Sequence, residues 1–224
     1  MKSEAQVIGK VRSQDLSVSW VSESGQRDIN TDRVCILMMA NGQVRLTMQS
    51  STINLKGMRL TRGHVCIFSL FEGNGRNEAD AADMASELFM NSVMRYDITK
   101  KPAKDILKKC LSKVDKKVVK KFGDASYKAS VAAFAAKDMT ACTVNGGRLF
   151  VISENGKISE LTSAGTEISH IGTSWKNVMM ASGGYPVVTE KIKDDLNSPI
   201  TEIVSKKELT MLPRSSSIIR VHRL

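Results

Sequence analysis

His64-Val-Cys-Ile-Phe-Ser-Leu-Phe71 is a continuous apolar run of strand length, and it leads directly into Glu72-Gly-Asn-Gly75. Because the run lies between Gly63 and Gly73 and shows no regular polar alternation, we expect a strand with both faces buried. The periodicity then changes, since between Asn77 and Tyr96 the apolar residues recur at helical spacing. A buried strand, a glycine-rich turn and a long helix therefore form the centre of the predicted fold.

A hairpin is predicted upstream of this run. Val34-Cys-Ile-Leu-Met-Met39 and Val44-Arg-Leu-Thr-Met48 flank Ala40-Asn-Gly-Gln43. Asn-Gly between two apolar runs is the strongest short-range hairpin signal, because both residues tolerate the positive φ of a type I′ turn. The two segments are expected to pair as antiparallel strands.

A second long helix is predicted downstream, from Pro102 to Phe122. Proline is favourable in a first helical turn, and Gly123 follows where helices commonly stop. An apolar stripe runs along this helix at helical spacing, so one side of it is expected to pack on a sheet. The stripe consists of Leu107, Leu111, Val114 and Val118.

The rest of the chain is predicted to form mostly strands. They are expected at Ser130–Ala136, from Thr140, at Leu149–Ser153 and within Asn155–Thr162, and strands are expected to recur until about Met180. Short helices are expected at Val188–Leu196 and Ile200–Glu208, and a last strand at Ser217–Leu224. This order indicates an α+β sandwich with its helices on the outside. Because the 224 residues contain 42% hydrophobic and 25% charged residues and no linker-like stretch, a single domain over residues 1–224 is expected.

Four short segments carry the candidate functional residues, and we refer to them as motifs one to four. They are Arg27-Asp-Ile-Asn-Thr-Asp32, Phe71-Glu-Gly-Asn-Gly75, Ala181-Ser-Gly-Gly184 and Ser215-Ser-Ser-Ile-Ile219. In order and spacing they resemble the metal-coordinating motifs of the metal-dependent serine/threonine protein phosphatases of type 2C, the PPM family. The family motifs read approximately R-x-x-N/M-E-D, F-D-G-H-G, A-S-D-G and D-N-I-T. The stretches between the motifs also match, so the resemblance covers essentially the whole chain.

The resemblance implies an α-β-β-α sandwich, in which two antiparallel sheets are flanked by helices. Active members carry a flap, a further strand and a helix in the region that corresponds to Thr162–Ala181. Only a short connection is expected between these two residues, so the substrate-facing flap segment is predicted to be shortened.

Most of the acidic metal ligands that the resemblance implies are missing. Asp32 and Glu72 remain, together with the backbone carbonyl of Gly73. A pair of divalent cations needs several carboxylates to offset its four positive charges. No metal or other cofactor is therefore expected, and Mg²⁺ or Mn²⁺ would bind only if a residual activity used Asp32 and Glu72. The positions at which the ligand is lost are Thr31, Gly146 (in Val144-Asn-Gly-Gly-Arg148, similar to the family's V-G-D-S-R), Gly183 and Ser215.

Two other family positions survive only as remnants. Arg27 keeps the five-residue offset from Asp32 at which the family places the arginine that binds substrate phosphate. The same residue is also consistent with a surface arginine that pairs with a nearby carboxylate. Asn74 replaces the histidine of D-G-H-G, and an amide does not transfer protons at neutral pH. No catalytic residue is therefore expected.

The positive charge is concentrated in one helix. Ten lysines lie between Lys100 and Lys121, against Asp105 and Asp115, within a formal net charge of +10. Such a segment is either a solvated face or a docking surface for an acidic protein or a larger complex. Arginine is absent from it, so contact with a nucleic acid would involve the backbone and not the bases. The candidate partner-binding residues are Lys109, Lys113, Lys116 and Lys120.

The location of the protein is predicted from what the sequence lacks. No apolar stretch approaches the ~18 residues of a membrane span, and the first residues contain no hydrophobic signal core. A cytoplasmic protein without membrane contact is expected.

The cysteines lie far apart without metal-site spacing, which favours buried free thiols. They are Cys35, Cys66, Cys110 and Cys142.

These observations lead to the hypothesis of a catalytically inactive type 2C phosphatase-like domain, a pseudophosphatase, that serves as a protein-binding or structural module in a larger assembly. Two alternatives stay open. One is a residual metal-dependent serine/threonine phosphatase. The other is a basic structural subunit of a ribonucleoprotein or of a cytoskeletal, microtubule or axonemal, complex.

Overall fold

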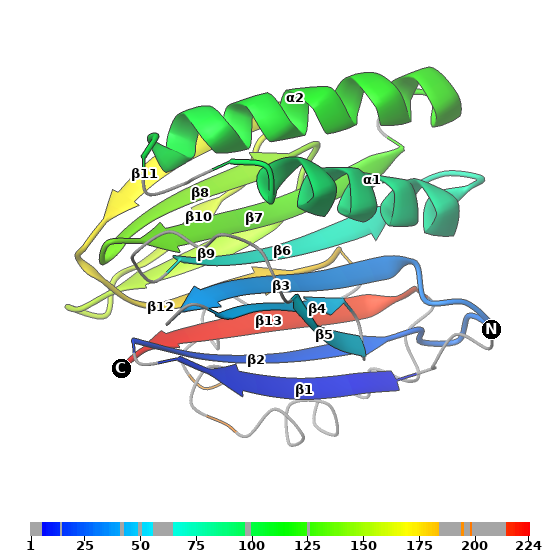
Figure 1. Cartoon of the computed structure of the whole chain (residues 1–224). Coiled ribbons are helices and arrows are strands. Elements are labelled where there is room, and N and C mark those ends of the chain that lie inside the picture. The colour runs from blue at the N-terminus through cyan, green and yellow to red at the C-terminus, as the bar shows by residue number, and fades with distance from the viewer. Residues whose placement is uncertain are drawn as a thin grey trace.

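The computed structural model describes residues 6–13, 15–40, 43–48, 51–55, 65–96, 100–124, 126–183, 194, 198 and 214–224. These residues form two antiparallel sheets, with two helices covering the outer face of one sheet (Figure 1). The elements are β1 (Gln6–Arg12), β2 (Leu16–Glu23), β3 (Asp32–Ala40), β4 (Gln43–Met48), β5 (Ser51–Leu55), β6 (Val65–Gly73), α1 (Glu78–Val93), α2 (Ala103–Phe122), β7 (Tyr127–Ala135), β8 (Asp138–Val144), β9 (Arg148–Ser153), β10 (Ile158–Leu161), β11 (Thr166–Gly172), β12 (Trp175–Ala181) and β13 (Ser216–Arg223).

The strand order places segments from both halves of the chain side by side. The six-stranded sheet has the order β1-β2-β13-β12-β9-β10, and the seven-stranded sheet has the order β11-β8-β7-β6-β3-β4-β5. The final strand, β13, lies between β2 and β12 and pairs antiparallel with both, as Figure 1 shows for β2. The predicted pairing of the hairpin strands is confirmed in β3 and β4.

Strands β3 and β6 lie in the middle of the seven-stranded sheet and are buried on both faces. Successive residues of a strand point to opposite faces. Leu37 and Ile67 belong to the apolar core shared with the helices, whereas Ile36 and Phe68 belong to the core between the two sheets. The predicted buried strand is thus confirmed in β6, because a strand covered on both sides needs apolar residues at every position.

The two predicted helices are confirmed close to their predicted limits. Helix α1 packs on the seven-stranded sheet through buried side chains such as Phe89. Helix α2 ends at Phe122, and Gly123 follows with a φ of 92°, a value that favours glycine. The predicted apolar stripe of α2, namely Leu107, Leu111, Val114 and Val118, is buried.

The prediction that strands recur until about Met180 is confirmed, whereas the prediction of only a short connection between Thr162 and Ala181 is wrong. Two strands, β11 and β12, fill this region. Strand β11 forms an edge of the seven-stranded sheet and is only partly buried, so its sequence lacks a strong alternating pattern. The predicted helices at residues 188–196 and 200–208, and the Asn-Gly turn at residues 41–42, lie outside the described residues.

The four cysteines are free and buried, as predicted. Burial raises the pKa of their thiols, to about 11 for Cys110 and about 12 for Cys35, Cys66 and Cys142. They are therefore protonated at neutral pH and pack as small apolar groups. In the part of the chain that the structure describes, neither helix is long and apolar enough to cross a membrane.

Candidate functional site

The four motifs meet at one end of the sandwich. Asp32 begins β3 and lies opposite Glu72, near the end of β6, in the antiparallel register. Motif three follows β12 and motif four leads into β13, and these two strands are hydrogen-bonded neighbours. The Thr31 N–H donates to Ser215 Oγ at 2.9 Å and so joins motif one in one sheet to motif four in the other.

Serine hydroxyls hold motifs three and four together. The Ser217 N–H donates to Ser182 Oγ at 2.8 Å, and the Ser182 N–H donates to the Ser217 carbonyl at 2.9 Å. Ser217 Oγ also shares a hydrogen bond of 2.7 Å with Ser22 Oγ, which accepts from Asn30 Nδ2 at 2.8 Å. All four side chains are buried. The motifs are therefore linked to one another by direct neutral hydrogen bonds.

Asp32 lies at the centre of this arrangement and is fully buried. Burial, followed by the negative charge of Glu72, raises the pKa of its carboxyl from 3.8 to about 7. Hydrogen bonds from the Ser217 and Ser182 side chains and the charge of Arg33 act in the opposite direction. The balance makes Asp32 a group that holds a proton well above the usual range of an aspartate.

Glu72 turns towards motif three. Its Oε2 accepts a hydrogen bond of 2.8 Å from the Gly183 N–H. A Cβ atom at position 183 would lie only 2.9 Å from Glu72 Oε1. The longer side chain at position 72 therefore reaches the space into which a side chain at position 183 would extend, and the two changes from the family pattern are sterically linked.

Lys128 completes this cluster and was missed by the sequence analysis. It pairs with Glu72 in the β6–β7 register, and its Nζ lies 3.9 Å from Glu72 Oε1. The sequence did offer a signal, because a lysine stands near the start of a strand segment that is otherwise made mostly of small and apolar residues, Tyr127-Lys-Ala-Ser-Val-Ala-Ala133. The ammonium group places a fixed positive charge beside the one remaining carboxylate of motif two.

Arg27, the candidate phosphate ligand, is paired with Glu78 at the start of α1. The neighbouring Arg33 forms a second ion pair with Asp83 on the same helix. Both guanidinium groups therefore attach motif one to α1, in accordance with the structural alternative for Arg27. Asn74 is exposed, and its N–H donates to the Ser126 carbonyl at 2.9 Å.

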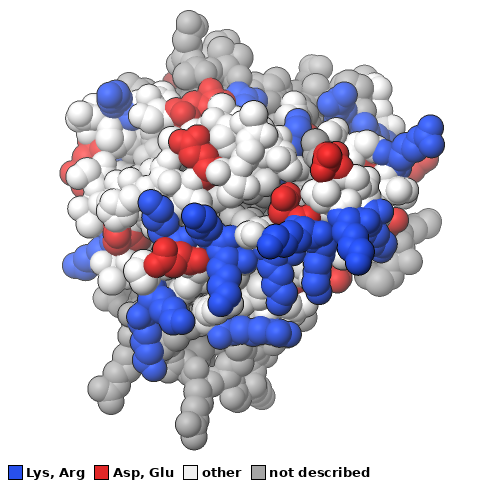
Figure 2. Space-filling view, turned by 90° about the horizontal axis from the view of Figure 1, so that it is seen from above, with Lys and Arg blue, Asp and Glu red and all other residues white. Residues whose placement is uncertain are grey.

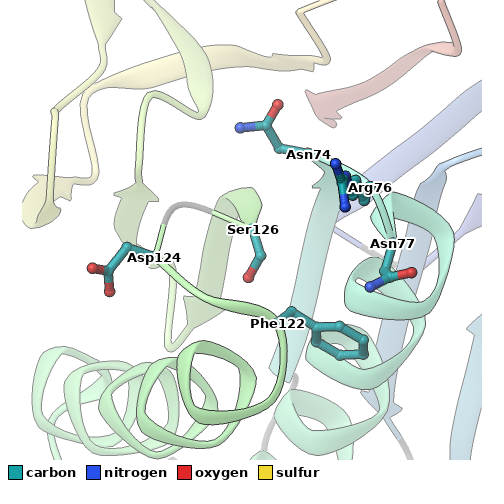
Figure 3. A pocket seen from close by; sticks show the side chains of 7 residues that line it. Asn74, Arg76, Asn77, Phe122, Asp124 and Ser126 are labelled. Carbon is teal, nitrogen blue, oxygen red and sulfur yellow. The ribbon is translucent and has the colours of Figure 1, made fainter.

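A polar pocket lies beside Asn74, between the loop that precedes α1 and the end of α2 (Figure 3). Arg76 and Asp124 supply charges of opposite sign, and Phe122 forms an apolar wall. The lining contains a single carboxylate and neither histidine nor cysteine, so it offers no pair of groups for acid and base catalysis. The lining residues are Asn74, Gly75, Arg76, Asn77, Phe122, Asp124 and Ser126.

The glycines at the motif positions have structural explanations. A Cβ atom at Gly73 would lie 1.8 Å from the backbone carbonyl oxygen of Glu78, so α1 approaches β6 too closely for any side chain there. Gly146 has a φ of 85° in the turn between β8 and β9, and its N–H donates to the Ser163 carbonyl at 2.6 Å. Gly146 thus contacts the loop between β10 and β11.

The described side chains do not fit a two-metal centre. Residues 6–183 with their gaps, and 214–224, contain no group of three or more His, Cys, Asp or Glu side chains placed to hold one ion. Of the positions at which the family places acidic metal ligands, only Asp32 and Glu72 keep a carboxyl group, and Asp32 holds a proton up to about pH 7. Glu72 is engaged by Gly183 and Lys128. Four positive charges would therefore meet too little negative charge.

The candidate partner-binding lysines lie away from these motifs. Lys109, Lys113, Lys116 and Lys120 are all exposed on α2, one of the two helices that cover the outer face of the seven-stranded sheet. Lys109 Nζ lies 5.4 Å from the centre of the Tyr96 ring.

Comparison with solved structures identifies the fold. RsbX, solved in complex with magnesium, matches with a TM-score of 0.63 at 12% identity, covering 97% of this chain and 100% of RsbX. The Mycobacterium tuberculosis serine/threonine phosphatase PstP matches with a TM-score of 0.61 at 14% identity, covering 93% and 98% of the two chains. PstP has also been solved with two manganese ions.

A third match is the PPM Ser-Thr phosphatase MsPP from Mycobacterium smegmatis, with a TM-score of 0.59 at 13% identity over 94% of this chain and 99% of MsPP. By sequence, neither a family model nor a curated protein matches. The identities of 12 to 14% are too low to transfer an activity, but the matches extend over nearly the whole length of the three chains. The chain therefore has the two-sheet α+β fold of the PPM-type serine/threonine phosphatases.

Proposed function

We propose that this chain is a catalytically inactive phosphatase-like domain that serves as a binding or structural module in a larger assembly. The observation that carries the proposal is the state of Glu72. Its carboxylate accepts from the Gly183 N–H at 2.8 Å and lies 3.9 Å from Lys128 Nζ. The acidic side chain most able to bind a cation is thus already satisfied by groups of the protein.

The hydrogen bonds around Asp32 support the same proposal. Metal-dependent phosphoryl chemistry needs a cation held by several carboxylates so that a bound water loses its proton near neutral pH. Here the motifs bind one another through Ser182, Ser215 and Ser217, and Asp32 is buried among them. These interactions stabilise the motif region as a packed junction between the two sheets.

The remaining remnants add no catalytic group. Arg27 pairs with Glu78, whose carboxylate offsets the positive charge that a substrate phosphate would meet. Asn74 carries no proton that it can transfer.

A hydrolysis assay tests the proposal. The purified protein is incubated with para-nitrophenyl phosphate and with a phosphothreonine peptide, in millimolar Mn²⁺ or Mg²⁺ and in EDTA. We expect the same background rate under all conditions, for wild type and for Asp32→Asn. Metal-dependent turnover that Asp32→Asn removes would overturn the proposal and establish a residual phosphatase that uses Asp32 and Glu72.

A further inference from the structure

The helical layer of this protein has its charges separated between two neighbouring helices. Helix α2 contains eight lysines against two aspartates, a surplus of six positive charges. Helix α1 contains four carboxylates, Glu78, Asp80, Asp83 and Glu87, and neither lysine nor arginine. Figure 2 shows the blue side chains gathered in a band across this face, with separate red groups beside it. The positive surface is therefore one helix wide.

Within α2, four lysines form a continuous stripe. Lys109, Lys113, Lys116 and Lys120 are spaced by four, three and four residues, so they fall within about 60° of the helix circumference. Their Cα atoms extend over ~17 Å along the axis. All four are exposed. Asp105 lies one turn before Lys109 on nearly the same side of α2 and so ends the run of positive charge, whereas Asp115 lies on another side of the helix. We refer to these four residues as the lysine stripe.

The width of the positive surface distinguishes between classes of partner. Packed helices have axes about 8 to 10 Å apart, whereas the major groove of a nucleic-acid duplex alone is about 12 Å wide. A duplex laid on α2 would therefore bring phosphates over α1, where Asp80 and Glu87 are exposed. A narrower polypeptide can contact the stripe without meeting these carboxylates.

The spacing along the stripe favours a helical partner. Carboxylates at positions i, i+4, i+7 and i+11 of a second helix recur over the same ~17 Å as the four lysines. In an extended strand, four alternate residues on one face extend over ~20 Å. Carboxylates on such a strand would therefore fall out of register with the four lysines by about half of the distance between neighbouring carboxylates. Lysine ammonium groups act as point charges and do not demand the bidentate geometry of arginine.

We propose that the lysine stripe docks an acidic helical segment of a partner protein. The proposal rests on the proposed function, because it names the chemistry of the partner that a binding module would take. It places the contact on α2 and leaves the motif region around Glu72 as a structural junction.

The test is a binding titration with a designed probe. The probe is a fluorescent helical peptide with glutamates at i, i+4, i+7 and i+11, measured by anisotropy at about 50 mM and about 200 mM salt. The stripe variant carries Lys→Glu at positions 109, 113, 116 and 120. The matched control carries Lys→Glu at positions 104, 108, 117 and 121, so it has the same net charge on the same helix.

We expect the stripe variant to bind about tenfold more weakly than the matched control at low salt, since four exposed pairs contribute a few tenths of a kcal/mol each. Equal loss in both variants, or loss in neither, would overturn the proposal. If the Lys→Glu variant does not fold by circular dichroism, Lys→Gln at the same four positions removes the charges without reversing them and is judged by the same criterion.

Two further measurements distinguish other occupants. A wild type that binds an RNA duplex more tightly than the peptide, through the same four lysines, would assign the stripe to nucleic acid. A dimer in sedimentation that the stripe variant loses would assign it to α1 of a second copy. The hydrolysis assay on the same preparations separates the two proposals: metal-dependent turnover would overturn inactivity alone, and failed stripe binding without turnover would overturn docking alone.

Discussion

At the scale of single residues, Asp32 links the loss of metal ligands to a measurable pH dependence. Its carboxyl has a pKa of about 7 in the folded protein, above the ordinary value of 3.8, because of burial and then the charge of Glu72. The folded state therefore binds this proton more tightly than the unfolded chain does. The stability that the proton provides is fully present below about pH 4 and is lost as the pH rises through about 7.

Asp32→Asn is therefore expected to stabilise the protein relative to wild type at about pH 8 and to change its stability little at about pH 4. The difference between the two conditions should be on the order of 4 kcal/mol at most, since each pKa unit corresponds to about 1.4 kcal/mol. Urea unfolding at both pH values measures it. Asp124→Asn, at an exposed position, is the control. A difference between Asp32→Asn and wild type that is the same at both pH values would contradict the prediction.

Glu72 and position 183 are expected to be energetically coupled. Gly183→Asp places a Cβ atom 2.9 Å from Glu72 Oε1 and adds a like charge, so it should destabilise the protein by about 1 to 2 kcal/mol. Glu72→Ala removes both conflicts, and the double variant should be more stable than the sum of the single effects predicts. Gly165→Asp, where a Cβ atom meets nothing within 4 Å, is the control. Strict additivity in the unfolding free energies would show that the two positions are independent.

At the scale of elements, the approach of α1 to β6 depends on a glycine. The Gly73 N–H donates to the Thr31 carbonyl at 3.0 Å, and the Glu78 carbonyl oxygen lies where a Cβ atom would be. The ion pairs of Arg27 with Glu78 and of Arg33 with Asp83 attach the same helix to the segment around the start of β3. The turn between β6 and α1 is therefore held from two sides.

Gly73→Ala is accordingly expected to cost at least about 2 kcal/mol of stability, because the obstacle is backbone and α1 has to move. Thermal or urea unfolding measures the loss. The matched control is Gly165→Ala, which adds the same methyl group in open space. A Gly73→Ala protein as stable as this control would mean that α1 does not lie as close to β6 as described.

At the scale of the whole molecule, the fold is expected to be indifferent to divalent cations. A cation applied at about one hundred times the Kd of its site would stabilise the folded state by about 2.7 kcal/mol. For a domain of this size such a gain raises the melting temperature by several degrees. The carboxylate pair of Asp32 and Glu72 gives no basis for that gain, since one group is protonated up to about pH 7 and the other is paired with Lys128.

We therefore expect thermal melting in EDTA, in millimolar Mg²⁺ and in millimolar Mn²⁺ to agree within about 1 °C. A sample in NaCl at the same ionic strength controls for the effect of salt on the exposed charges of the lysine-rich surface. A rise of several degrees that Asp32→Asn abolishes would reveal a metal site at the motifs. It would also reopen the question of catalysis.

Much of the architecture could be predicted because the spacing of apolar residues along each element depends on how that element is buried. The apolar run before Phe71 and the helical spacing along Pro102–Phe122 each report how one element is buried, and both elements were predicted close to their limits. Strands were expected to recur until about Met180, which β11 and β12 confirm, but the limits of β11 were not predicted, because a half-buried edge imposes little pattern. The absence of acidic residues at Thr31, Gly146, Gly183 and Ser215 is likewise read from the sequence.

The contacts made by the residues that remain at the motifs could be seen only in the folded structure. Glu72 and Gly183 are 111 residues apart, and nothing in the sequence around them predicts that they are hydrogen-bonded. Lys128 faces Glu72 only through the β6–β7 register, and Arg27 reaches Glu78 only because α1 packs beside motif one. Periodicity reports burial within one element. Which charged and polar groups neutralise one another depends on how distant elements pack, and that packing sets the pKa of Asp32 and the state of Glu72.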